Sequence, residues 1–234
     1  MKLPTEKTPP NLTATQAKVL LYGVPKIGKS TLAAGIDPDH TLFLACEAGL
    51  SGLNTYQLPI GNWREFREAG ALLASKEHKY TTVVIDTVDE LLQMCTDDVL
   101  SKLGVTHAED LGYGKGWRAI SDEFRLRVNR LCSLDLGVWF ISHAKEHEKN
   151  TLVGTVSRYE PTISGATGRW LTGLVDYIFF ATSQLTDGGE ERILRTEPSG
   201  SWEAGGRIKL PDPLLLDAAT VREAMETATT RDTK

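Results

Sequence analysis

Short apolar runs alternate along the chain with longer segments in which apolar residues recur at helical spacing. The short runs are bounded by glycine, proline or polar residues, which is typical of buried strands, and the longer segments are typical of amphipathic helices. The predicted strands are Lys18–Tyr22, Thr41–Ala45, Thr81–Ile85, Gly137–Ser142, Val175–Thr182 and Arg192–Thr196. The predicted helices are Lys29–Ala34, Trp63–Lys76, Val88–Leu103, Trp117–Leu131 and Val221–Ala228. Alternation of this kind predicts an α/β fold with a mostly parallel central sheet and helices on both faces.

The same pattern divides the chain into a core and two ends. Residues 1–16 are polar and contain prolines, and we expect a flexible N-terminal tail there. Residues 17–215 carry the alternating elements, and 216–234 are expected to form a C-terminal helix and tail. Residues 144–168 are polar and contain glycines, so we expect a long loop, which is usually functional or disordered.

One motif lies between the first predicted strand and the first predicted helix. Residues Gly23–Ser30 read GVPKIGKS and match the phosphate-binding (Walker A) pattern G-x-x-x-x-G-K-[ST]. The glycines let backbone N–H groups point inward at phosphate oxygens, and the helix that follows adds its positive dipole end. Lys29 can reach the β- and γ-phosphates, and the Ser30 hydroxyl can bind Mg²⁺. The predicted nucleotide-binding residues of this loop are Gly23, Val24, Pro25, Lys26, Ile27, Gly28, Lys29, Ser30 and Thr31, with Lys26 expected as a solvated side chain. The loop predicts binding of ATP or a similar nucleoside triphosphate.

Acidic residues follow two of the predicted strands. Asp86 ends the run TTVVID in the Walker B pattern, where its carboxylate would help to hold Mg²⁺. Glu47 follows the second strand and is either a carboxylate that orients the attacking water or an exposed loop residue. Asp89 and Glu90 follow Asp86 and are either part of the site or favourable acids near a helix N-terminus.

A histidine lies at a third strand end. The strand Gly137–Ser142 brings His143 to the edge of the sheet where Asp86 and Glu47 are expected. His143 there could detect the γ-phosphate, or it could simply cap the strand.

Composition narrows the class of protein. The 234 residues carry a net charge of −5, which argues against strong DNA binding through bulk electrostatics. Cys46, Cys95 and Cys132 show no metal-binding spacing and are expected to be reduced core residues. No apolar run is long enough to span a membrane, and no secretory signal is visible, so we expect a cytoplasmic protein.

Together these motifs resemble a RecA-type ATPase core. More specifically, the chain is similar to phage-encoded AAA-type nucleotide-binding proteins, including the Sak-type single-strand annealing proteins with a minimal RecA core. The stretches that carry the resemblance are LLYGVPKIGKSTLA, LFLACEAGLSGL, YTTVVIDTVDELLQ, GYGKGW, WFISHAKE, GRWLTGLVDYIFFAT and RILRTEPSGSWEAGGRIKLP. They span residues 20–211.

The resemblance implies a RecA-like ATPase with ATP and Mg²⁺ as ligands. It implies catalytic roles for Glu47, Lys29 and His143, and metal binding by Ser30 and Asp86. It also implies a homo-oligomer in which a neighbouring subunit supplies a cation, with Lys145, Lys149 and Arg207 as candidates.

For function, the resemblance implies DNA recombination or single-strand annealing. Single-stranded DNA would be the partner, contacted by residues 144–168 or through a single-strand binding protein. Two alternatives remain open: a nucleotide-dependent switch that binds a protein partner, and an ATPase of another phage DNA process such as packaging or replication loading.

Overall fold

The computed structural model describes residues 3–151, 154–163 and 165–231, with the backbone alone at 149–151 and 154–156. The strands are β1 (Lys18–Gly23), β2 (Thr41–Ala45), β3 (Tyr56–Pro59), β4 (Thr82–Asp86), β5 (Gly137–Thr151), β6 (Gly154–Pro161), β7 (Tyr177–Thr186), β8 (Gly189–Arg195), β9 (Gly205–Gly206) and β10 (Leu214–Leu215). The helices are α1 (Lys29–Ile36), α2 (Trp63–Ala74), α3 (Val88–Leu103), the short 3-10 helix η1 (Ala108–Leu111), α4 (Lys115–Cys132), α5 (Gly165–Leu174) and α6 (Ala218–Arg231).

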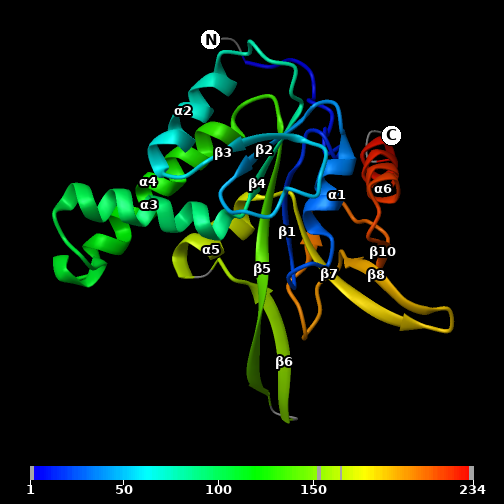
Figure 1. Cartoon of the computed structure of the whole chain (residues 1–234). Helices are drawn as coiled ribbons and strands as arrows, with labels where there is room; N and C mark the ends of the chain where they lie inside the picture. Colours follow the sequence, from blue (N-terminus) through cyan, green and yellow to red (C-terminus); the bar gives the residue numbers. More distant parts are fainter. Residues whose placement is uncertain (1–2, 152–153, 164, 232–234) are drawn as a thin grey trace.

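A mostly parallel sheet forms the centre of the molecule (Figure 1), in the strand order β10-β8-β7-β1-β5-β4-β2-β3. The pairs from β3 to β7 are parallel, and β8 and β10 add an antiparallel edge. The strand next to β1 is β5 rather than β4, so the end of β5 lies between the phosphate loop and Asp86. The predicted α/β class, with a mostly parallel central sheet and helices on both faces, is confirmed.

Each face of the sheet packs against its own set of helices because side chains alternate along every strand. On one face, Leu20 of β1 belongs to a core with residues of α2, α3, α4 and α5, including Trp63 and Phe124. On the other face, Val19 and Leu21 belong to a core with residues of α1 and α6. The sheet is thus buried on both sides, as its continuous apolar strands predict.

The prediction of a long loop at 144–168 is wrong, because most of the described residues in this range form two paired strands. The strand expected to end at Ser142 continues to Thr151 and pairs with β6 in an antiparallel hairpin, from Ala144 opposite Pro161 to Thr151 opposite Gly154. Figure 1 shows this hairpin projecting from the body beyond the end of the sheet. Its outer residues include Glu146, His147 and Glu148, which have no apolar face to mark a strand, and the backbone pairing decides the structure.

The two chain ends are more closely attached to the core than the sequence indicates. The N-terminal segment is anchored from Thr13, because Ala14 is buried and its carbonyl accepts a hydrogen bond from Trp139 Nε1 at 2.9 Å. At the other end, Val221 and Met225 of α6 are fully buried in the core that α1 shares. The N-terminal segment therefore joins the folded unit before the predicted boundary at residue 16, with Leu12 already packed against the core, and α6 is part of that unit.

Within the described ranges, no helix has the length and apolar character needed to cross a membrane.

Candidate nucleotide-binding site

The phosphate loop follows β1 and leads directly into α1. A Cβ on Gly23 would lie 2.4 Å from the carbonyl oxygen of Ala181, the residue beside it on β7, so only glycine fits there. Gly28 has a φ of 116°, which favours glycine, and it caps the N-terminus of α1. These two constraints turn the chain sharply after β1 and leave backbone N–H groups at the start of α1 free to meet an anion.

Lys29 lies at the centre of this loop and is 6% exposed. Its Nζ donates hydrogen bonds to the carbonyls of Gly23 at 2.9 Å and Val24 at 3.0 Å. An ammonium group has three donors, so one remains for a ligand. Burial lowers the pKa of Lys29, while the nearby acids Asp86, Glu47 and Asp89 oppose that shift. The loop therefore holds a desolvated cation that a phosphate would stabilise.

Ser30 and Asp86 face one another across the start of α1 and the end of β4. The Ser30 hydroxyl donates to Asp86 Oδ2 at 2.7 Å. Asp86 is 5% exposed, and burial raises its pKa. Both groups offer hard oxygen ligands, which is the chemistry that Mg²⁺ requires, and Mg²⁺ in phosphate sites is held by few protein ligands together with the phosphates. The oxygen chemistry of this pair fits a Mg²⁺–nucleotide.

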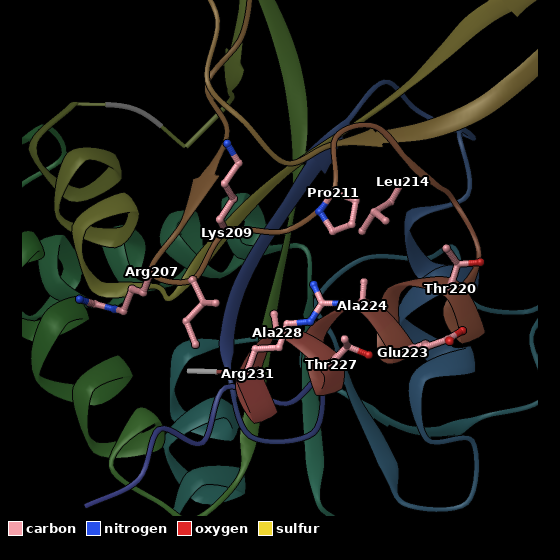
Figure 2. Close-up of a pocket in the computed structure, with 11 residues that line it drawn as sticks. Arg207, Lys209, Pro211, Leu214, Thr220, Glu223, Ala224, Thr227, Ala228 and Arg231 are labelled. Atoms are coloured by element: carbon pink, nitrogen blue, oxygen red, sulfur yellow. The ribbon is translucent and has the colours of Figure 1, made fainter. Parts of the chain in front are cut away.

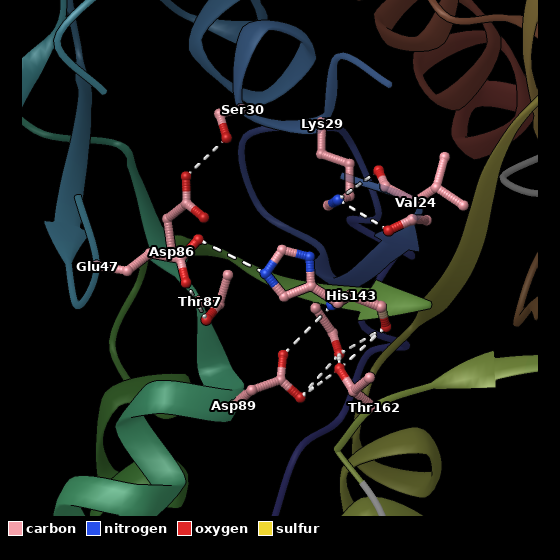
Figure 3. A network of polar contacts seen from close by, with 11 residues as sticks. Val24, Lys29, Ser30, Glu47, Asp86, Thr87, Asp89, His143 and Thr162 are labelled. Atoms are coloured by element: carbon pink, nitrogen blue, oxygen red, sulfur yellow. Dashed lines mark hydrogen bonds and ion pairs between the residues drawn. The ribbon is translucent and has the colours of Figure 1, made fainter. Parts of the chain in front are cut away.

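Glu47 and His143 meet beside this pair (Figure 3). Glu47 Oε1 lies 3.7 Å from His143 Nε2, and Glu47 Oε2 accepts a hydrogen bond from Thr87 Oγ1 at 3.3 Å. His143 Nδ1 is buried and has no hydrogen-bond partner among the described residues. The structure thus brings together the two side chains that the sequence placed at separate strand ends.

Asp89, which the sequence left open between two roles, is tied to the base of the hairpin. Its carboxylate accepts hydrogen bonds from Thr162 Oγ1 at 2.8 Å, Ser142 Oγ at 3.1 Å and the His143 backbone N–H at 3.3 Å (Figure 3). One aspartate therefore joins the end of β6 to the part of β5 that carries His143. No sequence signal singled out Thr162, because its partner lies far away in the chain.

The remaining loop residues surround this centre. The side chains of Val24, Pro25, Lys26 and Thr31 are exposed, and Ile27 is buried. Lys26 has a φ of 64° and, as predicted, is solvated. These positions offer a ligand mainly their backbone.

The three cations expected to act across a subunit boundary have different positions. Arg207 forms an ion pair with Asp176 at 2.8 Å, and Asp176 also accepts from the N–H of Lys18 at the start of β1, the end opposite the phosphate loop. Figure 2 shows Arg207 at the rim of a separate cavity between the β9–β10 segment and α6, with its side chain pointing away from it. Lys145 is half-buried on β5, and the side chain of Lys149 lies outside the described part of the chain. Arg207 cannot serve the phosphate loop of its own chain.

Comparison with known proteins identifies the family. A family model described as AAA domain (AAA_24) matches residues 15–208. The chain is also similar to the SPbeta prophage-derived uncharacterized protein YorG of Bacillus subtilis (strain 168), with 28% identity over 137 residues, or 56% of this chain and 42% of that protein. The matched region spans less than half of that relative's length. Because the family model covers most of the chain and includes the phosphate loop, the chain belongs to the AAA domain family.

Proposed function

We propose that this protein binds Mg²⁺–ATP and hydrolyses it, and that it acts in phage DNA recombination or single-strand annealing. The observation that carries the ATPase proposal is the convergence of four strand ends at one edge of the sheet. There, Lys29, Ser30, Asp86, Glu47 and His143 come together although they are far apart in the sequence. The AAA domain match and the similarity to a prophage-derived protein support the class and the phage context.

Each residue has a role that its position supports. Lys29 and the loop N–H groups hold the phosphates, and Ser30 and Asp86 hold the metal ion. Bound Mg²⁺ would neutralise charge on the phosphate oxygens. Glu47 orients a water molecule for attack, because its carboxylate faces the loop and is already positioned by Thr87. His143 reports the state of the site to the hairpin, because it lies at the point where β5 leaves the sheet.

The hairpin is the proposed contact with single-stranded DNA or with a partner protein. Lys145 and Arg158 offer positive charge, but Arg158 is paired with Glu160 at 2.9 Å. The exposed residues include Glu146 and Glu148. This near balance of charge favours engagement of DNA together with a single-strand binding protein over strong direct binding.

The same charge balance supports a second candidate, a nucleotide-dependent switch that binds a protein partner. In that case the nucleotide would order the hairpin for the partner, and hydrolysis would be incidental to binding. The ATPase proposal also includes a homo-oligomer. In it, a neighbouring subunit would supply a cation to the phosphates, from Lys145, Lys149 or Arg207.

The test is ATP hydrolysis by the purified protein, with and without single-stranded DNA, between about 50 and 200 mM salt. Stimulation by DNA that weakens as salt rises supports the recombination proposal. Hydrolysis or ATP binding with no response to DNA at either salt favours the protein-partner switch. Lack of both ATP binding and hydrolysis contradicts the ATPase proposal itself.

A further inference from the structure

The strand order fixes the direction in which a nucleotide must lie. All the groups proposed for the reacting end of the nucleotide, Asp86, Glu47 and His143, follow strands on one side of β1. The other side of β1, where β7 and β8 lie, is left for the inner phosphates and the rest of the nucleotide.

Arg192 of β8 lies at that other side, beside the phosphate loop. A Cβ placed on Gly28 would be 3.7 Å from Arg192 Nη1 and 3.3 Å from Leu216 Cδ2. The pairing of the strands explains why Arg192 lies at the same height as the phosphate loop. Gly23 at the end of β1 is opposite Ala181 of β7, and Arg192 is opposite Ser183, two positions farther along β7 and beyond the end of β1. The guanidinium of Arg192 thus reaches the glycine that caps α1.

The side chain of Arg192 is exposed and makes no hydrogen bond or ion pair with the described residues. Its neighbour Arg195, by contrast, is held by Gln184 at 2.9 Å and Asp212 at 3.7 Å. The backbone of Arg192 is fixed, since its carbonyl accepts from Leu216 N–H at 3.0 Å. A free cation on a fixed backbone, next to a loop built for phosphate, is placed to bind an anion there.

We infer that Arg192 binds the α- or β-phosphate of the nucleotide within its own chain, as a positioning residue for the proposed ATPase. This inference rests on the proposed function and names a cation that the sequence did not single out. A guanidinium is always charged and can donate two parallel hydrogen bonds to a phosphate. It binds ADP as well as ATP, because both contain these phosphates, whereas Glu47 and His143 act only at the γ-phosphate end.

The test compares wild type, Arg192→Gln, Arg192→Lys and the control Arg64→Gln by calorimetric titration with ATP and with ADP in the presence of Mg²⁺. Arg64 is an exposed arginine on α2, away from the loop. We expect Arg192→Gln to lose roughly tenfold in affinity for both nucleotides, and to a similar degree, with Arg192→Lys in between and Arg64→Gln unchanged. The melting temperature without nucleotide should be the same in wild type and in both Arg192 variants, because among the described residues the Arg192 side chain has no hydrogen-bond or ion-pair partner to lose.

Three results would overturn the inference. Affinities of Arg192→Gln within about twofold of wild type for both nucleotides would remove its role while leaving the proposed function intact. Loss of ATP affinity with unchanged ADP affinity would place Arg192 at the γ-phosphate instead. Failure of the wild type to bind either nucleotide would overturn the proposed function together with this inference.

Discussion

The carboxylate of Glu47 and the imidazole of His143 face one another at 3.7 Å, although they follow strands that are separated in the sheet by β4. Both side chains are 34% exposed and lie beside the buried Asp86. Glu47 also accepts a hydrogen bond from Thr87, and Lys29 donates to two carbonyls of its own loop, so the carboxylate and the ammonium group each have a defined position at this edge of the sheet.

Replacing Glu47 with Gln removes the proposed base while keeping the size of the side chain. We expect ATP turnover to fall by roughly 10² to 10⁴-fold, with ATP affinity changed by less than about threefold, because general-base catalysis contributes at this level. Steady-state hydrolysis and equilibrium binding should be measured on the same protein. Glu68→Gln, at an exposed glutamate on α2, is the matched control and should match wild type. Unchanged turnover in Glu47→Gln would exclude the role assigned to Glu47.

Replacing Lys29 with Ala should abolish nucleotide binding without unfolding the protein. The Lys29 ammonium is buried and its charge is disfavoured there, so its loss removes two hydrogen bonds but also a desolvation cost. The rise in melting temperature that saturating Mg²⁺–ATP gives the wild type should therefore disappear in the variant. A variant that still gains stability from ATP would show that the loop binds phosphate through its backbone alone.

Asp89→Asn tests the connection between the site and the hairpin. Asparagine has one acceptor oxygen in place of two, so it cannot hold Thr162, Ser142 and the His143 N–H together. We expect faster amide hydrogen exchange in residues 144–151 and 154–161, because the base of the hairpin loses an anchor, and a turnover lower by about tenfold, because His143 would no longer be held in place. Glu90→Gln, at the exposed neighbouring residue, is the control and should behave as wild type. Equal exchange in the two variants would mean that Asp89 does not anchor the hairpin.

Asp86→Asn should raise the melting temperature of the protein by an amount that depends on pH. Burial raises the pKa of Asp86 in the folded protein above its value in the unfolded chain. Between those two values the folded state binds more protons, so the stability contributed by Asp86 falls as pH rises through that window. Asparagine removes this cost, so the variant without nucleotide should melt a few degrees higher than wild type at about pH 7, by a difference that shrinks toward about pH 4.

The control for this variant is Asp39→Asn, at an exposed aspartate. The difference in melting temperature between this variant and wild type should not grow as pH rises. Asp86→Asn should also lose the dependence of nucleotide binding on Mg²⁺, since a neutral amide is a poor ligand for that ion. A difference in melting temperature that is constant with pH would contradict the assigned cause.

Gly23→Ala tests the close packing of the phosphate loop against β7. The added methyl group would lie 2.4 Å from the Ala181 carbonyl oxygen, so the strand pair must separate, at a cost of about 3 kcal/mol or more in the free energy of unfolding. Gly70→Ala on α2 is the matched control, because its added methyl meets nothing within 4 Å and should stabilise the helix by roughly 0.5 to 1 kcal/mol. Chemical denaturation of both variants measures the contrast.

Much of the site follows from local sequence. The phosphate loop, Asp86 and Glu47 are each marked by a residue type at the end of an apolar strand or within two residues of it, and the alternation of strands and helices sets them all at one edge of a parallel sheet. These features depend on hydrophobic spacing and on the backbone freedom of glycine, which act over a few neighbouring residues. The sequence therefore determined the α/β class, the apolar strands at the centre of the sheet and the residues of the phosphate loop.

The tertiary structure decided what lies between those motifs. The hairpin of β5 and β6, the bonds of Asp89 to Thr162, and the approach of Arg192 to Gly28 all join residues far apart in the chain. Polar strands leave no hydrophobic period to read, and a charged side chain carries no mark of its distant partner. Such contacts are fixed by strand order and backbone pairing, so they become visible only when the chain is folded.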